Sequence, residues 1–229
     1  ISMLATKDNH LETKNYAAYA QSGAISLIAA NNYLSSDQDT INAKTNGLIT
    51  IHANKSNNDN SGSNLISAKY VNGYGEGLAV QALSKGSVEI SAQETNSIFG
   101  AISSKNEGSS VSVDGKTNTV KSSAVISNAG NLNNATDDKF KDNRVISALY
   151  AEGTGAQISL TGEQNYLSTF ANSSVHTDLE RVVWAYDGAD INIDGFTSIT
   201  TDSYEKSLNS IDIAIAAGTA VNLTEDIVN

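Results

Sequence analysis

The sequence predicts an all-β fold, a parallel β-helix (a solenoid) with three short strands per coil and a few loop insertions. Two observations lead to this prediction: a glycine-led strand motif recurs along the chain, and two further strand motifs accompany it in a constant order. The composition agrees, because the 229 residues include no Pro and only 17% of them are charged. Pro would remove a hydrogen-bond donor from a strand that is paired on both sides. A sheet with few charges also needs an architecture that hides its edges.

The first element is a Gly followed, after one to three small or polar residues, by a triplet that reads apolar, polar, apolar. Such alternation is typical of a half-buried strand, and the preceding Gly marks a turn. The triplets begin at Ile25, Ile49, Val88, Val111, Ile158, Ile191 and Val221, after Gly23, Gly47, Gly86, Gly108, Gly155, Gly188 and Gly218.

The second and third elements are shorter. Eight residues after Ile25 and Ile158 stand Tyr33 and Tyr166, each within an Asn-Tyr-Leu-Ser string. The third element precedes the next Gly and reads apolar, any residue, Ala. Its copies are Ile41-Asn42-Ala43, Ile66-Ser67-Ala68, Val80-Gln81-Ala82, Phe99-Gly100-Ala101, Ile146-Ser147-Ala148 and Val183-Trp184-Ala185.

The spacing of the triplets predicts how the strands pair. They start 24, 39, 23, 47, 33 and 30 residues apart, and we expect each strand to pair with its equivalent one coil later, about 4.8 Å along the axis. The interval of 47 is expected to hold a degenerate coil around 123–126 and an insertion. Stacked Asn or Ser at the turns should hydrogen-bond to the copies above and below.

We interpret residues 1–229 as one β-helical unit cut from a longer protein, with insertions near 54–64, 128–143 and 172–181. Insertions in a solenoid project from one side and often carry function. An antiparallel sandwich or barrel also has short alternating strands, and it remains the structural alternative.

Charge and composition exclude several classes of function. The net charge of −11 argues against binding nucleic acid, which needs clustered Lys and Arg. The absence of Cys excludes disulfides and Cys-based metal sites. No apolar run is long enough to span a bilayer, and the first residues lack the basic region of a signal peptide. No cofactor motif is present.

No catalytic or metal site is predicted. Asp187, Asp190 and Asp194 have the spacing of neither an EF-hand nor a calcium repeat, and we read Asp187 as a turn residue before Gly188. The Asp-containing strings of a polygalacturonase-like site are absent as a set. A polysaccharide-degrading β-helix enzyme, either a lyase or a glycosidase, nevertheless remains the alternative function. It would need a carboxylate cluster in a cleft on one sheet.

Exposed apolar side chains are the candidate binding site. If the apolar and Ala positions of the third element point inward, the residues between and after them point outward. This places Leu83, Ile102, Leu149, Trp184 and Tyr186 in an outward stripe, and such patches mark interfaces. The alternative is that the insertion at 128–143 covers the stripe through Leu132 and Phe140. Tyr70 and Tyr74 are candidates for contacts with a glycan.

The glycine-led triplets, such as Gly188-Ala189-Asp190-Ile191-Asn192-Ile193, and the Asn-, Ser-, Thr- and Gly-rich background resemble the passenger domains of bacterial autotransporters. The resemblance implies a right-handed β-helix that is secreted to the bacterial cell surface and held at the outer membrane by a separate C-terminal barrel. A minority of such passengers carry protease or esterase domains, but the sequence contains no catalytic signature of either, so we do not expect an enzyme. The resemblance also implies an adhesin that contacts a host or bacterial surface protein or a glycan, or that self-associates in aggregation and biofilm formation.

Overall fold

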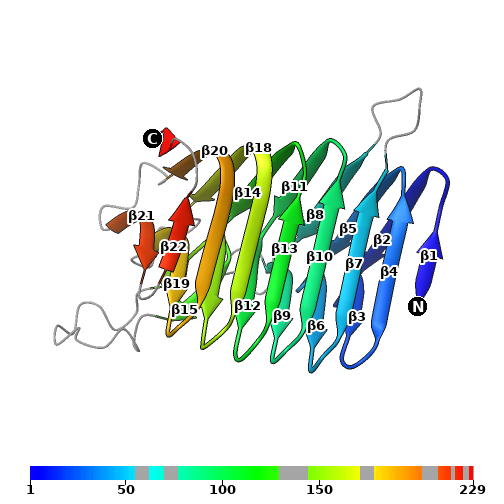
Figure 1. Cartoon of the computed structure of the whole chain (residues 1–229), viewed down its shortest axis with the longest axis horizontal. Helices are drawn as coiled ribbons and strands as arrows, with labels where there is room; N and C mark the ends of the chain where they lie inside the picture. Colours follow the sequence, from blue (N-terminus) through cyan, green and yellow to red (C-terminus); the bar gives the residue numbers. More distant parts are fainter. Residues whose placement is uncertain are drawn as a thin grey trace.

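The chain is all-β in the computed structural model, which describes residues 1–54, 62–69, 77–128, 144–170, 178–202, 211–217, 220–223 and 227–228. These residues form strands and no helix. Most strands lie in parallel pairs in a 14-stranded and a 9-stranded sheet, which curl around a common core so that the whole is nearly closed (Figure 1). Within the described residues no helical segment has the length and apolar character to cross a membrane.

The strands fall into three rows, and successive strands of the chain pass from one row to the next. The first row contains β1 (Ser2–Leu4), β4 (Ala24–Ala29), β7 (Leu48–Ala53), β10 (Ser87–Ala92), β13 (Ser110–Asp114), the first halves of β18 (Gln157–Phe170) and β20 (Asp190–Asp202), and β22 (Ala220–Leu223). The second contains β2 (Asp8–Thr13), β5 (Asn31–Ser36), β8 (Ser63–Ala68), β11 (Thr95–Phe99), β14 (Thr117–Ser122), the second halves of β18 and β20, and β23 (Ile227–Val228).

The third row contains β3 (Ala18–Ala20), β6 (Ile41–Lys44), β9 (Leu78–Leu83), β12 (Ala101–Lys105), β17 (Leu149–Glu152), β19 (Asp178–Tyr186) and β21 (Ile211–Ala217). Two further strands, β15 (Val125–Asn128) and β16 (Arg144–Ile146), lie at its end. In Figure 1 the first row faces the viewer and the second lies behind it.

The pairing of the first row follows the register expected from the glycine-led triplets. Ile25 pairs with Ile49, Ile49 with Val88, Val88 with Val111, and so on through Ile158 and Ile191 to Val221. All pairings among the described strands are parallel, except that of β15 with β16. The antiparallel alternative is therefore wrong.

The core lies between the three rows and consists of small and medium aliphatic side chains. One inward residue from each row shows the arrangement: Ile49, Ile66 and Ile41 have no exposed surface. Burying a side chain of this size contributes roughly 1.5–3 kcal/mol, and the period of two along each strand repeats the contribution at alternate positions. Packing of inward apolar residues is therefore the main stabilising interaction that the sequence pattern encodes.

Two sequence expectations about the third row are wrong. Val80 pairs with Ile102, and Ile102 pairs with Leu149, so the copies of the third motif begin at these residues and not at Phe99 and Ile146. Gly100, with a φ of 119°, separates β11 from β12 and interrupts the expected Phe99 copy. The third-element motif at Ile66 belongs to β8 of the second row.

The expected degenerate coil around 123–126 is also absent, because β15 pairs antiparallel with β16 while Val111 pairs directly with Ile158. The ranges of all three predicted insertions overlap strands: β8 begins at Ser63, β15 ends at Asn128 and β19 begins at Asp178. Residues 55–61, 129–143 and 171–177 lie outside the described part of the chain.

A ladder of buried asparagines runs through the second row. Each side-chain amide donates to the Oδ1 atom of the next Asn at 2.8–2.9 Å, and the members are Asn9, Asn32, Asn64, Asn96, Asn118 and Asn165. From Asn32 onward each amide also donates to a backbone carbonyl at the corner between the first and second rows, at 2.7–3.0 Å. Thr197 occupies the next register position and ends the ladder. Asn residues therefore stack as expected, but they do so within the strands of the second row and not at the turns.

Asp39 is a partly buried carboxylate in the turn between β5 and β6. Loss of hydration raises the pKa of Asp39 above its ordinary value of 3.8, although the Leu78 N–H, which donates to Oδ1 at 3.2 Å, and the charge of Lys44 oppose the shift. A raised pKa means that this group's contribution to stability is fully present below the unfolded value and is lost as the pH rises through the folded value.

We therefore expect Asp39→Asn to raise the melting temperature at about pH 7 and to leave it nearly unchanged at about pH 3. Asparagine keeps an acceptor for the Leu78 N–H but carries no charge. Thermal denaturation of wild type and variant at both pH values measures the effect, and Asp37→Asn, at an exposed aspartate two residues away, is the control. A variant that is less stable than wild type at about pH 7 contradicts the prediction.

Candidate functional site

The binding stripe predicted on the third row does not form, because Ile102 and Leu149 point into the core. Both side chains have no exposed surface. They are in register with the inward residues Val80 and Val183. A shift of one residue along a strand exchanges its inward and outward faces. The motif copies assigned to Phe99 and Ile146 therefore placed Ile102 and Leu149 on the outer side of the sheet, where they do not lie.

Trp184 does point away from the main core, but it is covered. It packs in a second cluster with Val145 of β16 and Tyr150 of β17, and Ile126 of β15 lies against this cluster. The rings of Trp184 and Tyr150 are 4.8 Å apart, and only 5% of Trp184 is exposed. The segments on either side of the predicted 128–143 insertion therefore supply the cover. Leu132 and Phe140, the expected covering residues, lie outside the described part of the chain.

Cations border the cluster. The Arg181 guanidinium lies 4.5 Å from the centre of the Trp184 ring, and Lys105 Nζ lies 4.7 Å from that of Tyr150. The Tyr150 hydroxyl donates to Glu152 Oε2 at 2.7 Å, and Lys105 is 3.6 Å from the same oxygen. Burial, the hydrogen bond to Glu152 and the charge of Glu152 raise the pKa of Tyr150 above its ordinary value. Charged and hydrogen-bonding groups therefore border the cluster, and because Tyr150 and Trp184 are both buried, little aromatic surface is left for a ligand.

The remaining predicted residues do not restore the stripe. Leu83 is half-buried and Tyr186 is 42% exposed. Between them in the same register position stand Lys105 and Glu152. The charged side chains of Lys105 and Glu152 therefore separate Leu83 from Tyr186 and interrupt the predicted apolar stripe. Tyr70 and Tyr74 lie outside the described residues.

The outer face of the second row carries the largest set of exposed apolar side chains in the described part of the chain. Tyr33, Leu65, Phe99, Tyr166 and Phe196 come from β5, β8, β11, β18 and β20, and each is 36–40% exposed. The neighbours of Tyr33, Leu65 and Tyr166 along their strands are inward Asn, Leu and Ile residues, and Phe99 lies between Ile98 and Gly100. We call the outward positions of β5, β8, β11, β14 and residues 164–168 of β18 the second-row face.

The second-row face is almost uncharged. Its other members carry mostly hydroxyl or amide groups, and Lys121 is its only charged residue. Lys121 Nζ lies 5.1 Å from the centre of the Phe170 ring. The face is therefore neutral and lined with hydroxyl groups and aromatic rings, although the whole chain has a net charge of −11.

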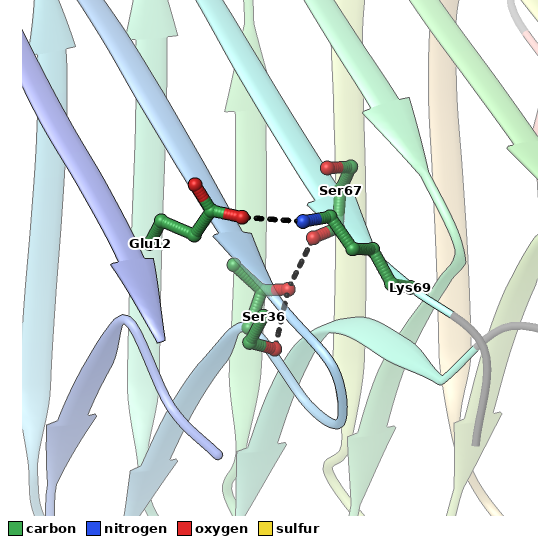
Figure 2. A network of polar contacts seen from close by, with 5 residues as sticks. Glu12, Ser36, Ser67 and Lys69 are labelled. Atoms are coloured by element: carbon green, nitrogen blue, oxygen red, sulfur yellow. Dashed lines mark hydrogen bonds and ion pairs between the residues drawn. The ribbon is translucent and has the colours of Figure 1, made fainter. Parts of the chain in front are cut away.

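Polar contacts mark one border of this face (Figure 2). Glu12 of β2 and Lys69, which follows β8, form a 2.5 Å ion pair that passes the end of β5. The ion pair lowers the pKa of Glu12 and raises that of Lys69. Beneath it Ser36 Oγ lies 3.1 Å from Thr40 Oγ1, which donates to the Ser67 carbonyl at 2.7 Å. Exposed ion pairs contribute little to stability. The main consequence of this network is that it marks the border between the nearly uncharged second-row face and charged residues.

An open groove of about 580 Å³ lies at the corner between the first and second rows, lined by Asp114, Gly115, Lys116, Thr161, Gly162, Glu163, Asp194 and Gly195. Lys116 also pairs with Glu94 at 3.4 Å. Among the residues that the structure describes, no group of three His, Asp or Glu side chains is placed to hold a metal ion. Asp187 lies in a turn with a φ of 52°, as the sequence predicts. The groove brings Asp114, Glu163 and Asp194 to one lining, which is the kind of carboxylate cluster that a polysaccharide-degrading activity needs.

The sequence contains a signal for the second-row face that the predicted site did not use. Asn32 and Leu34 point inward, so a period of two places Tyr33 outward, and the same holds for Tyr166. Leu65 and Phe99 could have been found only through the register, because no Asn-Tyr-Leu string marks their strands.

Scans of the chain against protein-family models, curated proteins and solved structures each gave no match.

Proposed function

We propose that the chain is a segment of a right-handed parallel β-helix that serves as an adhesive module on a bacterial cell surface, in the manner of an autotransporter passenger. Repeated parallel pairing along three rows supports a β-helix, because each strand meets its equivalent one repeat later. The handedness, the secretion route and the attachment to an outer membrane rest on the sequence resemblance alone.

The observation that carries the adhesive role is the second-row face. Tyr33, Leu65, Phe99 and Tyr166 expose apolar surface on one side of a sheet whose inner side is fully packed. Exposed apolar groups that gather on one face are typical of an interaction surface, and Tyr is a frequent anchor in such surfaces. The partner is a host or bacterial surface protein or glycan, or a second copy of the chain.

Attachment of protein-coated beads to bacterial and epithelial cells tests the proposal. We expect the double variant Tyr33→Ala/Tyr166→Ala to reduce attachment by about tenfold, which corresponds to a loss of about 1.4 kcal/mol for the two anchors together. The double variant Tyr19→Ala/Tyr186→Ala is the matched control, since these tyrosines are 40% and 42% exposed on the third row.

Three outcomes count against the proposal. Equal attachment by wild type and the Tyr33/Tyr166 variant contradicts the role of the second-row face. Loss of attachment in the Tyr19/Tyr186 variant alone moves the site to the third row, where the sequence places it. Release of reducing sugars from a polysaccharide, abolished by Asp194→Asn in the groove, favours the enzymatic alternative.

A further inference from the structure

The second-row face also indicates which class of partner it fits, an inference that rests on the adhesive role proposed above. We propose that this face binds a neutral, extended polysaccharide. Three features of the described residues indicate this partner: the near absence of charge, the spacing of the rings and the polar groups between them.

Charge is the first feature. Lys121 is the only charged residue of the second-row face, and the remainder of the chain is strongly acidic. An acidic polysaccharide would be repelled by the net charge and would find a single cation on the face. A protein partner with a charged rim would lack opposite charges on this face. A neutral ligand meets neither difficulty.

Ring spacing is the second feature. Tyr33, Phe99 and Tyr166 stand on β5, β11 and β18, and one strand of the row separates each from the next. Two strand steps are about 10 Å, which is close to the length of two linked sugar units in an extended β-1,4 chain. Phe99 is displaced by two residues along its strand relative to the tyrosines, so the rings follow a zigzag across the face.

The polar groups are the third feature. Ser35, Ser67, Ser97 and Thr119 are half-buried on this face, and their hydroxyls lie among the rings. Hydroxyls both donate and accept hydrogen bonds, as do the hydroxyls of a sugar. The C–H faces of sugar rings pack on aromatic rings, which have an apolar body. The hydroxyls of the second-row face can therefore bind the hydroxyls of a neutral sugar chain, and its aromatic rings can pack against the C–H faces of the sugars.

Affinity electrophoresis in native gels tests the inference with a pair of ligands that share one backbone. We expect hydroxyethylcellulose, which is neutral, to retard the protein, and carboxymethylcellulose, which is acidic, to leave its mobility unchanged. Tyr33→Ala/Tyr166→Ala should weaken the retardation by about tenfold. Tyr19→Ala/Tyr186→Ala should retain it. Added salt should have little effect, because no ion pair with the ligand is involved.

Galactomannan and laminarin extend the neutral set, and failure of all three neutral polymers to retard the protein overturns the inference. Stronger retardation by carboxymethylcellulose, or retardation by hydroxyethylcellulose that the Tyr33/Tyr166 variant retains, overturns it too. The adhesive role is judged separately: if bead attachment depends on Tyr33 and Tyr166 but no neutral polymer binds, the role stands and the ligand class is wrong. Light scattering that shows dimers dependent on the same tyrosines assigns the face to a second copy instead.

Discussion

Gly86→Ala is expected to lower the free energy of unfolding by about 3 kcal/mol, which is large for the addition of one methyl group. A Cβ atom at this position would lie 2.2 Å from the Ala43 carbonyl oxygen and 2.6 Å from its carbon. Both are backbone atoms, so no side-chain rotation relieves the overlap. The neighbouring repeats must separate at this corner, which strains the bonds from Ser87 N to Gly47 O and from Ser110 N to Gly86 O.

Gly23→Ala is the matched control for this prediction. Gly23 precedes the equivalent strand one motif earlier than Gly47, but a Cβ atom there meets nothing within 4 Å. We expect this variant to be as stable as wild type or slightly more stable, because Ala reduces the freedom of the unfolded chain. Urea denaturation followed by circular dichroism measures both variants. Equal unfolding free energies for the Gly86 and Gly23 variants would show that the close backbone approach does not constrain the fold.

The same comparison explains why the first row was predictable from the sequence. Gly47 and Gly86 each end a turn whose two central residues have positive φ, and each donates its N–H to the residue three positions earlier, at 2.8–2.9 Å. Such turns need a residue without a side chain at a close approach. At these two corners the close approach of the backbone requires Gly before the triplet, whereas Gly108, Gly155 and Gly188 themselves have a positive φ of 67–81°. Both requirements place a Gly shortly before the strand, which makes the triplets of the first row recognisable in the sequence.

The third row was less predictable because its only marker was Ala, which many inward positions accept. Ala101 and Ala148 matched the motif but lie just before the inward residues Ile102 and Leu149. In Ile102-Ser103-Ser104 a serine takes the Ala position, so the true copy was hidden. An error of one residue exchanges inside and outside, and two of the predicted binding residues moved to the core for this reason.

The covering of Trp184 could not be predicted from the local pattern at all. It depends on Ile126 and Val145, which belong to strands that leave the repeat and pair antiparallel. By contrast, the exposure of Tyr33 and Tyr166 follows from a repeat in which Asn and Leu face inward. Sequence reasoning therefore succeeds where the surface follows the repeat and fails where a departure from the repeat covers it.

The Asn ladder gives the second large effect, and Asn96→Ala is expected to destabilise the chain by about 3 kcal/mol. Asn96 is in the middle of the ladder: it accepts from Asn64 at 2.9 Å and donates to Asn118 at 2.8 Å and to the Asp114 carbonyl at 2.8 Å. Alanine leaves one buried donor and two buried acceptors without this partner, and each unsatisfied group costs about 1–3 kcal/mol before water or local movement compensates.

Asn192→Ala controls for the amide itself. Asn192 Oδ1 accepts from Asn222 at 2.7 Å in a stack of the first row that is exposed to solvent. Water can replace that hydrogen bond, so we expect a change below about 0.5 kcal/mol. Asn9→Ala provides an intermediate case, because Asn9 has one Asn neighbour and a longer bond of 3.4 Å to the Ile28 carbonyl.

The order Asn96, Asn9, Asn192 in urea denaturation, from the largest loss to the smallest, is the expected result. The order depends on how many buried groups each substitution leaves without a hydrogen-bond partner. It does not depend on the residue type, which is the same in all three. A loss at Asn192 as large as that at Asn96 would mean that the amide stabilises its own strand locally. In that case the buried ladder would not be what couples one repeat to the next along the second row.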